Sequence, residues 1–549
     1  MIPSQISFKI AALLIVCAVL LAYAPFLNNQ LFWDDEQFIY NNYYVKTFDV
    51  ARIFTTNTIA GAGELSNYYR PLTTLSFAID YQFWGDSPIG YHLTNMLAHL
   101  AAALLLLAVL RTLKLPHLAA LGISVLFAVH PIQTEAVAYA NSRGDSLYSM
   151  WALMGIYSFL QVINHRSKTI FIYDQTWTIL KHHWAWLALV SFVASILSKE
   201  IGIASVGIWA LLLTLHLIKS SQQNWRRTFV EQSAALWVLA GAFAIASTYM
   251  ALRFTILRFQ PELNLYGDSS YGTSMLVRLL TFSKNLWLYG QLLLAPVQLH
   301  MERVVDVVES LSSPWPWASA LLIVCIIWAG WLELKRRQTT WIWLGLGWFL
   351  IMMAPISGIL PINGMFYEHW LYLPMVGFWL TGVGLYELVE IKLRWIKTLF
   401  IGACIGLLIL TWRQNYIWAN PIRFYTYTLR FSDAARLHNN LGMAYAQAGD
   451  LPMAVNSYRA AIERDDQYPQ THHNLANALV SLSEYDQAQA EFKRALEISP
   501  GFAPSIMSLA QLQYRTGDAS AAATTLERAL ELAPQDEALR QLMQTLRSK

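Results

Sequence analysis

The sequence is poor in charge. Only 13% of its 549 residues are Asp, Glu, Lys or Arg, against 56% hydrophobic residues. Such a composition excludes an intrinsically disordered chain and an ordinary water-soluble enzyme. The net charge of +3 is small, and no run of Lys and Arg resembles a phosphate-binding face, which excludes nucleic acid as the partner.

Cysteine is also scarce. Cys17, Cys325 and Cys404 all lie in apolar runs, where a thiol usually behaves as a small hydrophobic side chain. The sequence therefore predicts neither a disulfide framework nor a zinc site. Glycine-rich phosphate loops, a P-loop and a serine nucleophile elbow are absent as well, so nucleotide hydrolysis is not indicated.

Long apolar runs are what the sequence has in abundance. The first, residues 10–27, is uncharged and long enough to span a membrane, which takes about 17 to 25 residues. Ala22-Tyr23-Ala24 resembles a signal-peptidase site, but the many later runs favour an uncleaved first span. The later runs are 91–113, 118–136, 147–163, 184–197, 201–218, 233–252, 275–298, 317–334, 341–356, 370–389 and 398–412.

Basic residues in the connecting loops predict the orientation, because short cytoplasmic loops collect Lys and Arg. Five loops are basic, near positions 111–114, 166–181, 219–227, 335–337 and 392–397. All five can be cytoplasmic only if one run does not cross. We interpret the run at 275–298, which contains Arg278 and Lys284, as an interfacial or re-entrant helix. The prediction is an all-α bundle of about 11 spans, with the N-terminus cytoplasmic and the C-terminal region outside.

The C-terminal region differs from the rest, since its last 116 residues hold 23 of the 73 charged residues. It repeats every 34 residues, the period of tetratricopeptide (TPR) helix pairs. The positions that recur are Leu441/Leu475/Leu509, Ala454/Ala488/Ala522, Tyr458/Phe492/Leu526, Ala461/Ala495/Ala529 and Asp466/Pro500/Pro534. The predicted domains are a membrane domain at 1–415, a linker at 416–433, and a TPR domain at 434–549 with three repeats and a terminal helix at 535–549.

Three consecutive carboxylates, Asp34, Asp35 and Glu36, lie among aromatic residues just after the first span. Adjacent carboxylates repel each other, which costs free energy unless a cation, a proton or a substrate compensates. Acids that decorate a helix N-terminus are the alternative, since the helix dipole favours them there. Both interpretations stay open, although the flanking aromatics favour a site over a solvated face.

Cations stand at other loops of the same face. Arg70 precedes the second span, and Arg143 follows the third with Asp145 close behind. Lys199 and Glu200 separate two spans with almost no loop, so both lie at the membrane surface. Ionisable groups at that depth usually face a cavity or a partner, and the alternative is a Lys199–Glu200 pair that serves as an interfacial anchor.

Histidines supply no convincing metal site. His92, His99 and His130 lie within or at the ends of spans, where an imidazole more often bonds a neighbouring helix than binds a metal. Neither His-x-x-x-His nor Cys-x-x-Cys spacing is present. We predict no metal ligands and no cofactor, while a divalent cation held by the carboxylates stays open as an alternative.

Acids, cations and a repeat domain on one face suit transfer of a group from an anionic lipid carrier to a protein. One alternative is a membrane-anchored TPR scaffold without catalysis, although eleven spans are more than an anchor needs. A transporter or lipid flippase is the other alternative. It predicts ionisable residues in the middle of the spans, which largely lack them.

Several motifs, in one order along nearly the whole chain, resemble the transmembrane-and-TPR-containing O-mannosyltransferases (TMTC). They are Phe32-Trp33-Asp34-Asp35, Tyr69-Arg70-Pro71-Leu72, Gly90-Tyr91-His92-Leu93-Thr94-Asn95, Phe127-Ala128-Val129-His130-Pro131, Thr134-Glu135-Ala136-Val137, Arg143-Gly144-Asp145, Leu197-Ser198-Lys199-Glu200 and Leu371-Tyr372-Leu373-Pro374. With only three repeats, the chain looks like a bacterial relative.

The resemblance implies a GT-C membrane glycosyltransferase. Such an enzyme takes a sugar, here most simply mannose, from a polyprenyl- or dolichyl-phosphate and inverts the anomeric centre. The acceptor would be a protein Ser or Thr hydroxyl outside the membrane, recruited through the TPR groove. The expected membrane is the bacterial cytoplasmic membrane, or that of the endoplasmic reticulum in a eukaryote.

The family motif places its two acids on Asp34 and Asp35. Hydroxyl attack on an anomeric carbon needs a base, for which Asp34 is the candidate, and Asp35 would orient the acceptor or fix a cation. Cations should meet the departing phosphate, and the candidates are Arg70, Arg143 and Lys199. Expected supporting residues are Glu36, His92, Asp145, Glu200 and Glu368, the last in a Glu368-His369 pair at the position of the family's acidic-basic pair.

Overall fold

The computed structural model describes residues 6–165, 183–257, 269–337, 339–359, 364–389 and 395–532, with residues 362, 537, 540–541 and 543–544. Within these ranges every regular element is a helix, which confirms the all-α class. The predicted basic loop at 166–181, part of that at 392–397 and most of the terminal helix at 535–549 lie outside the described residues.

The chain forms two compact units, Met1–Ala419 and Asn420–Lys549. Helix α18 (Ile396–Trp418) extends past the predicted domain end at 415. The segment predicted as a linker contains a helix, α19 (Pro421–Thr428). That helix begins where it does because the Asn420 side chain accepts a hydrogen bond from the Arg423 N–H and a proline occupies the first turn.

Among the described residues of the first unit, six apolar segments are long enough to cross a membrane. They are Phe8–Phe26, which includes α1 (Phe8–Tyr23), Pro88–Thr112 (α5), Ala140–Asn164 with α8 (Arg143–Asn164), Glu200–Lys219 at the start of α11 (Ser205–Glu231), Ser233–Phe254 (α12) and Pro314–Arg337 (α15). Shorter apolar helices are α10 (His183–Ser198), the Trp341–Ile356 segment with α16 (Trp341–Met353), and α17 (Met375–Val389). The chain is thus a multi-pass membrane protein, and the number of eleven spans stays a prediction.

One predicted span is broken. Residues 118–136 form α6 (His117–Val129) and α7 (Thr134–Ala138), whose segments are bent by 49° at His130-Pro131. Proline has no N–H and disfavours helical backbone at the residue before it. The carbonyls that lose their helical donors find side chains instead: His99 Nε2 lies 3.2 Å from the Ala128 oxygen, and the Thr411 hydroxyl donates to the Val129 oxygen at 2.7 Å.

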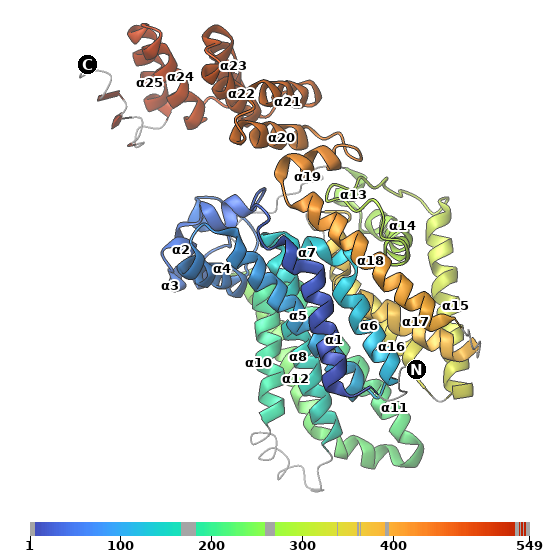
Figure 1. Cartoon of the computed structure of the whole chain (residues 1–549). Coiled ribbons are helices and arrows are strands. Elements are labelled where there is room, and N and C mark those ends of the chain that lie inside the picture. Colours follow the sequence, from blue (N-terminus) through green and yellow to red (C-terminus); the bar gives the residue numbers. More distant parts are fainter. Residues whose placement is uncertain are drawn as a thin grey trace. The chain divides into compact units, whose positions relative to one another are not determined.

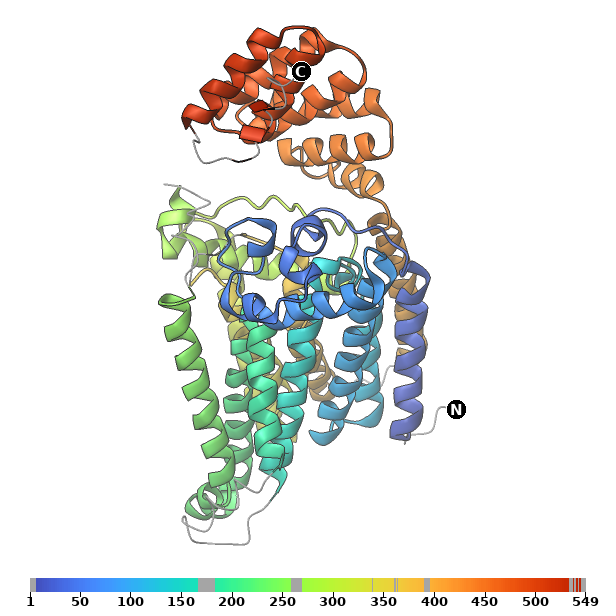
Figure 2. The same ribbon diagram turned by 90° about the vertical axis from the view of Figure 1, so that its left-hand side faces the viewer.

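The loop after α1 is itself folded, which the sequence pattern did not predict. It contains α2 (Tyr43–Lys46), α3 (Val50–Thr55) and α4 (Pro71–Trp84), around a small core of Phe38, Ile39, Val45, Ile53 and Phe77. Figure 1 shows α2, α3 and α4 gathered at one end of the helix bundle, the end at which α7 also lies. Figure 2 shows the long helices running side by side below this folded loop.

Helix α14 (Met275–Leu294), predicted as interfacial or re-entrant, is not among the six segments able to cross. Its Arg278 is buried and donates to the carbonyl oxygens of Gly358, Tyr271 and Gly272. Lys284 of the same helix pairs with Asp306 at 2.8 Å. Both charged side chains thus bind other groups of the protein.

The second unit contains the helix pairs of the repeats. They are α20 (Ala435–Gln447) with α21 (Leu451–Arg464), α22 (Pro469–Ser481) with α23 (Tyr485–Ile498), and α24 (Ala503–Arg515) with α25 (Ala519–Leu532). Ala454, Ala488 and Ala522 are fully buried, because paired helices cross closely at the small residues. Met543, from the predicted terminal helix, joins the core of the last repeat.

Candidate active site

The acidic residues lie in a tight turn. Trp33 has a φ of 63°, a conformation that a bulky side chain rarely adopts, that costs about 1–3 kcal/mol and that persists only where the surrounding structure holds it. Asp35 helps to hold the turn in this conformation, since its Oδ2 accepts a hydrogen bond from the Phe32 N–H at 3.1 Å. Its Oδ1 accepts from the Asn141 N–H at 2.8 Å, which ties the turn to the segment before α8.

Asp35 is only 1% exposed. Burial raises the pKa of its carboxyl well above the usual range, and the neighbouring charge of Asp34 adds to the rise. The two backbone N–H groups and the positive charge of Arg143 act in the opposite direction. Asp35 is therefore occupied as an anchor of the turn, with both oxygens already engaged.

Asp34 is half-buried beside a group of aromatic rings. Its backbone N–H donates to the Tyr139 hydroxyl at 3.2 Å. The Tyr139 ring stacks on Trp418, with 5.2 Å between centroids, and Trp418 also approaches Phe32. The next residue, Glu36, is half-buried and begins a single π-helical turn (η2, Glu36–Tyr40), an irregularity frequent at functional sites. The acidic turn is thus lined by side chains from α18 and from the segment before α8.

Arg143 is fully buried and shared among protein acceptors. One terminal nitrogen lies 2.6 Å from Asp80 and donates to the Tyr91 carbonyl at 2.9 Å. Nε donates to Asn95 at 2.6 Å, and the other terminal nitrogen donates to the Ser76 hydroxyl at 3.1 Å. A guanidinium so enclosed is not placed to meet a lipid phosphate. We therefore revise the expected role of Arg143, from a donor ligand to an anchor between α4, α5 and α8.

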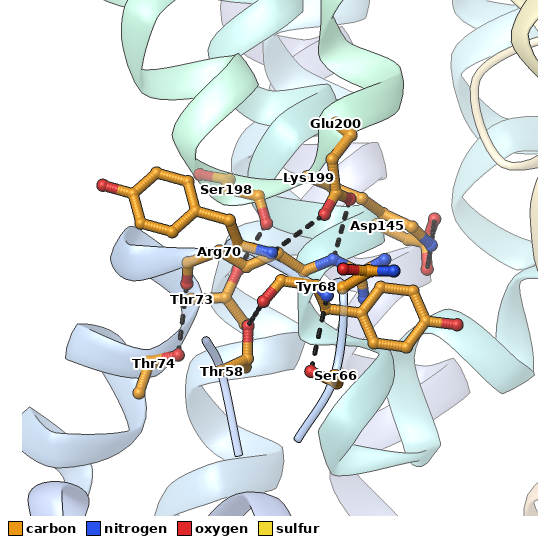
Figure 3. Close-up of polar contacts among 12 residues, drawn as sticks. Thr58, Ser66, Tyr68, Arg70, Thr73, Thr74, Asp145, Ser198, Lys199 and Glu200 are labelled. Carbon is orange, nitrogen blue, oxygen red and sulfur yellow. Dashed lines mark hydrogen bonds and ion pairs between the residues drawn. The ribbon is translucent and has the colours of Figure 1, made fainter. Parts of the chain in front are cut away.

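Lys199 and Asp145 form a buried ion pair. Lys199 Nζ donates to both Asp145 oxygens at 2.7 Å, and the two side chains are 11% and 3% exposed. Glu200, the neighbour of Lys199 in sequence, pairs instead with Arg70, whose Nε lies 2.9 Å from Oε2 (Figure 3). The alternative of a Lys199–Glu200 anchor is therefore wrong.

Arg70 stands at the start of α4, above the Tyr68 ring at 4.5 Å. The Tyr69 N–H donates to the second oxygen of Glu200 at 3.2 Å, and Thr73 donates to the Ser198 carbonyl at 2.7 Å. Figure 3 shows the contacts of Arg70 and Thr73 crossing from the folded loop to the break between α10 and α11. The chain can break there because Lys199 is extended, with a φ of −157° and a ψ of 138°.

Two further buried carboxylates belong to this region. Glu135 of α7 holds His369, with 2.7 Å between Oε1 and Nδ1, while its Oε2 accepts the His369 backbone N–H at 3.2 Å. Glu368 accepts from Arg303 and from the His300 N–H, both at 3.0 Å. Burial and the nearby charge of Glu135 raise the pKa of Glu368 to about 8, against the opposing effect of Arg303. The sequence predicts Glu368 as a supporting residue but gives no role to Glu135, although Glu135 lies in the motif Thr134-Glu135-Ala136-Val137.

His92 connects α5 to the start of the folded loop. Its Nε2 lies 3.0 Å from the carbonyl oxygen of Asn29, where the folded loop begins, and its side chain is buried. Asn95, one turn later in α5, donates to the carbonyls of Val137 and Tyr139. Among the described residues no three His, Cys, Asp or Glu side chains are grouped so that they could hold a metal ion.

Comparison with known proteins identifies the repeats of the C-terminal region. Family models of the tetratricopeptide repeat match residues 433–501 and 482–546. The chain is also similar to a solved structure of the TPR2B domain of yeast Sti1 in complex with pHsp70. That likeness has 28% identity and a TM-score of 0.19, and it covers 21% of this chain and 94% of the other.

The longer similarity includes the membrane unit. Protein O-mannosyl-transferase F38B6.6 of Caenorhabditis elegans is 25% identical over 478 residues, which cover 83% of this chain and 63% of the worm protein. Protein O-mannosyl-transferase TMTC4 of Mus musculus is 25% identical over 504 residues, which cover 83% of this chain and 67% of the mouse protein. The chain thus spans about two thirds of the length of these relatives, and a bacterial origin stays a prediction. In sequence, the chain is a homologue of the TMTC protein O-mannosyl-transferases that ends in tetratricopeptide repeats.

Proposed function

We propose that the protein is a membrane glycosyltransferase. It moves a sugar, mannose in the first instance, from a polyprenyl- or dolichyl-phosphate to a Ser or Thr hydroxyl of an extracytoplasmic protein, with inversion. One observation carries the proposal: the folded outer loop holds Asp34 in a strained, doubly anchored turn, in a chain homologous to protein O-mannosyl-transferases. A scaffold without catalysis has no need of that turn.

Asp34 is the base in this proposal. The acceptor oxygen attacks the anomeric carbon, the bond from that carbon to the phosphate oxygen breaks, and the hydroxyl proton passes to Asp34. A positioned base contributes roughly 10²–10⁴-fold to such a step. Asp35 stays in its hydrogen bonds to Phe32 and Asn141 and keeps the turn in shape.

Arg70 and Lys199 receive the donor phosphate. Hydrogen bonds of the Arg70 guanidinium within the described residues are found at Nε alone, so both terminal nitrogens remain for an anion. Lys199 uses two of its three N–H groups on Asp145. Preorganised cations in a region shielded from water stabilise the negative charge that develops on the departing phosphate. Glu200 and Asp145 keep the two cations in place before the donor arrives.

The repeat domain recruits the acceptor. A series of polar side chains runs along the first helices of the repeats: Asn474 donates to Asn439 at 3.1 Å, and His473 lies 3.1 Å from the Ser505 hydroxyl. Amide side chains can pair with the backbone of an extended peptide in any sequence context. Binding by a covalently attached domain raises the effective concentration of acceptor at the site.

The test uses purified full-length protein in lipid nanodiscs. A panel of radiolabelled undecaprenyl- and dolichyl-phosphate sugars is incubated with it and a Ser/Thr-rich acceptor peptide. The proposal expects label from the mannosyl donor to appear in the peptide. Retention of every label on its lipid would contradict the proposal and favour the scaffold.

A further inference from the structure

The pair of Glu135 and His369 has no part in the transfer described so far. The Glu135 carboxylate contacts both the ring Nδ1 of His369 at 2.7 Å and its backbone N–H at 3.2 Å. The two side chains are 5% and 13% exposed. A carboxylate bound at both points fixes the orientation of the imidazole, which leaves Nε2 as the atom available for chemistry.

Packing fixes the plane of the same ring. Tyr367 stacks on it with 5.3 Å between centroids and 23° between planes. Trp370 meets it edge-on at 6.2 Å. Among the residues that the structure describes, no hydrogen bond reaches His369 Nε2, so this nitrogen keeps its hydrogen-bonding capacity for a ligand.

The surroundings of His369 are those proposed for the donor phosphate. The pKa of its imidazole is lowered to about 3 by burial and by the positive charges of Lys199 and Arg70, against an opposite effect of Asp145. On its own segment, Glu368 is paired with Arg303. An anionic phosphate that binds among these cations offsets their effect, and its own negative charge favours a proton on the imidazole against the larger effect of burial.

We propose that His369 is a further catalytic residue, whose Nε2–H binds the phosphate of the lipid carrier and protonates it as it departs. Glu135 is the positioning residue that holds the ring for this step. The proposal rests on the function proposed above. It names the source of the proton that the departing phosphate receives, since Asp34 only takes the proton of the acceptor hydroxyl.

The protons and electrons balance. With donor bound, one proton lies between Nδ1 and Glu135 and a second lies on Nε2. As the bond from the anomeric carbon to the phosphate oxygen breaks, its electron pair stays on the phosphate and the Nε2 proton follows. The carrier leaves as a singly protonated monoester. After the transfer, Asp34 holds the proton of the acceptor hydroxyl. Water then carries this proton from Asp34 to His369.

The test compares three variants of the full-length protein in nanodiscs, with dolichyl-phosphate mannose as donor. His369→Gln retains hydrogen-bonding capacity but cannot give up a proton. Glu135→Gln retains the ring and removes the charge that orients it. His472→Gln is the matched control, because His472 and Glu491 of the repeat domain form a pair of the same 2.7 Å length.

For His369→Gln we expect kcat to fall about 100-fold with less than a threefold change in the donor KM. The decline of kcat at high pH, which reports loss of the Nε2 proton, should disappear. Glu135→Gln should lower kcat about 10- to 100-fold and shift that decline, as loss of an orienting carboxylate does elsewhere. His472→Gln should match the unaltered protein.

An active parent protein whose His369→Gln and Glu135→Gln variants keep kcat and the pH profile would overturn the inference alone. A raised donor KM with unchanged kcat would overturn it too, since it shows binding without proton donation. A parent that transfers no sugar from any donor of the undecaprenyl- and dolichyl-phosphate panel would overturn both proposals. Gel filtration checks folding, and if His369→Gln misfolds, Glu135→Gln decides the outcome.

Discussion

Replacing Arg143 by Met should destabilise the protein strongly. Methionine fills most of the volume but leaves the Asp80 carboxylate, 5% exposed, without its counter-charge. It also removes the donors to Asn95, Ser76 and the Tyr91 carbonyl. Breaking one side of a buried ion pair costs about 3–5 kcal/mol. The Asp80 hydrogen bond from Thr94 remains and keeps the cost within that range.

A double-mutant cycle isolates the pair. Unfolding free energies are measured by denaturant titration in mixed micelles for Arg143→Met, Asp80→Leu and the double variant. A well-packed apolar pair often replaces a buried ion pair without loss of stability. The unfolding free energy of the double variant should therefore be higher, by about 2 kcal/mol or more, than the sum of the two single effects predicts. Lys284→Met, in a pair whose Asp306 is 91% exposed, is the control and should leave stability unchanged. Strictly additive single changes would refute the anchoring role of Arg143.

Three further outcomes are expected. Asp35→Asn should lower the unfolding free energy by about 1–3 kcal/mol in the same titration, because an amide oxygen replaces only one of the two oxygens that accept from backbone N–H groups. An unchanged unfolding free energy would contradict the role of Asp35 as an anchor of the turn. Glu368 has a folded pKa of about 8 against an ordinary value of 4.5, so the folded state binds its proton more tightly. Stability should therefore fall as pH rises from about 5 to 8, and Glu368→Gln should remove that fall. Arg70→Leu should raise the donor KM about tenfold and leave the acceptor KM unchanged, whereas equal changes in both would indicate a general disturbance of the loop.

The repeats and the apolar runs could be predicted from sequence because each reports a local physical requirement. The 34-residue period fixes which residues face a neighbouring repeat, and Ala454, Tyr458 and Ala461 are buried as the register requires. Apolar runs report burial in lipid or protein, and the helices largely follow them. The break at His130-Pro131 was within reach of the sequence, since a proline inside an apolar run often interrupts a helix.

The partners of the charged residues could not be predicted, because they depend on distant segments. Lys199 and Glu200 are adjacent, yet extended backbone at Lys199 sends successive side chains to opposite sides, so each finds a different partner. Glu135 and His369 are 234 residues apart, so no local pattern in the sequence pairs them. The same limit led to the first interpretation of Arg143 as a phosphate ligand.

In the proposed transfer, Asp34 takes the proton of the acceptor hydroxyl. The most direct measurement is the rate at which radiolabelled mannose moves from its lipid phosphate to peptide with purified Asp34→Asn protein, against Glu64→Gln in the same outer loop. Glu64 is exposed, so its variant should match the parent protein. Asp34→Asn should keep about 1% of the rate or less, with the donor still bound. A rate equal to that of Glu64→Gln would contradict the account.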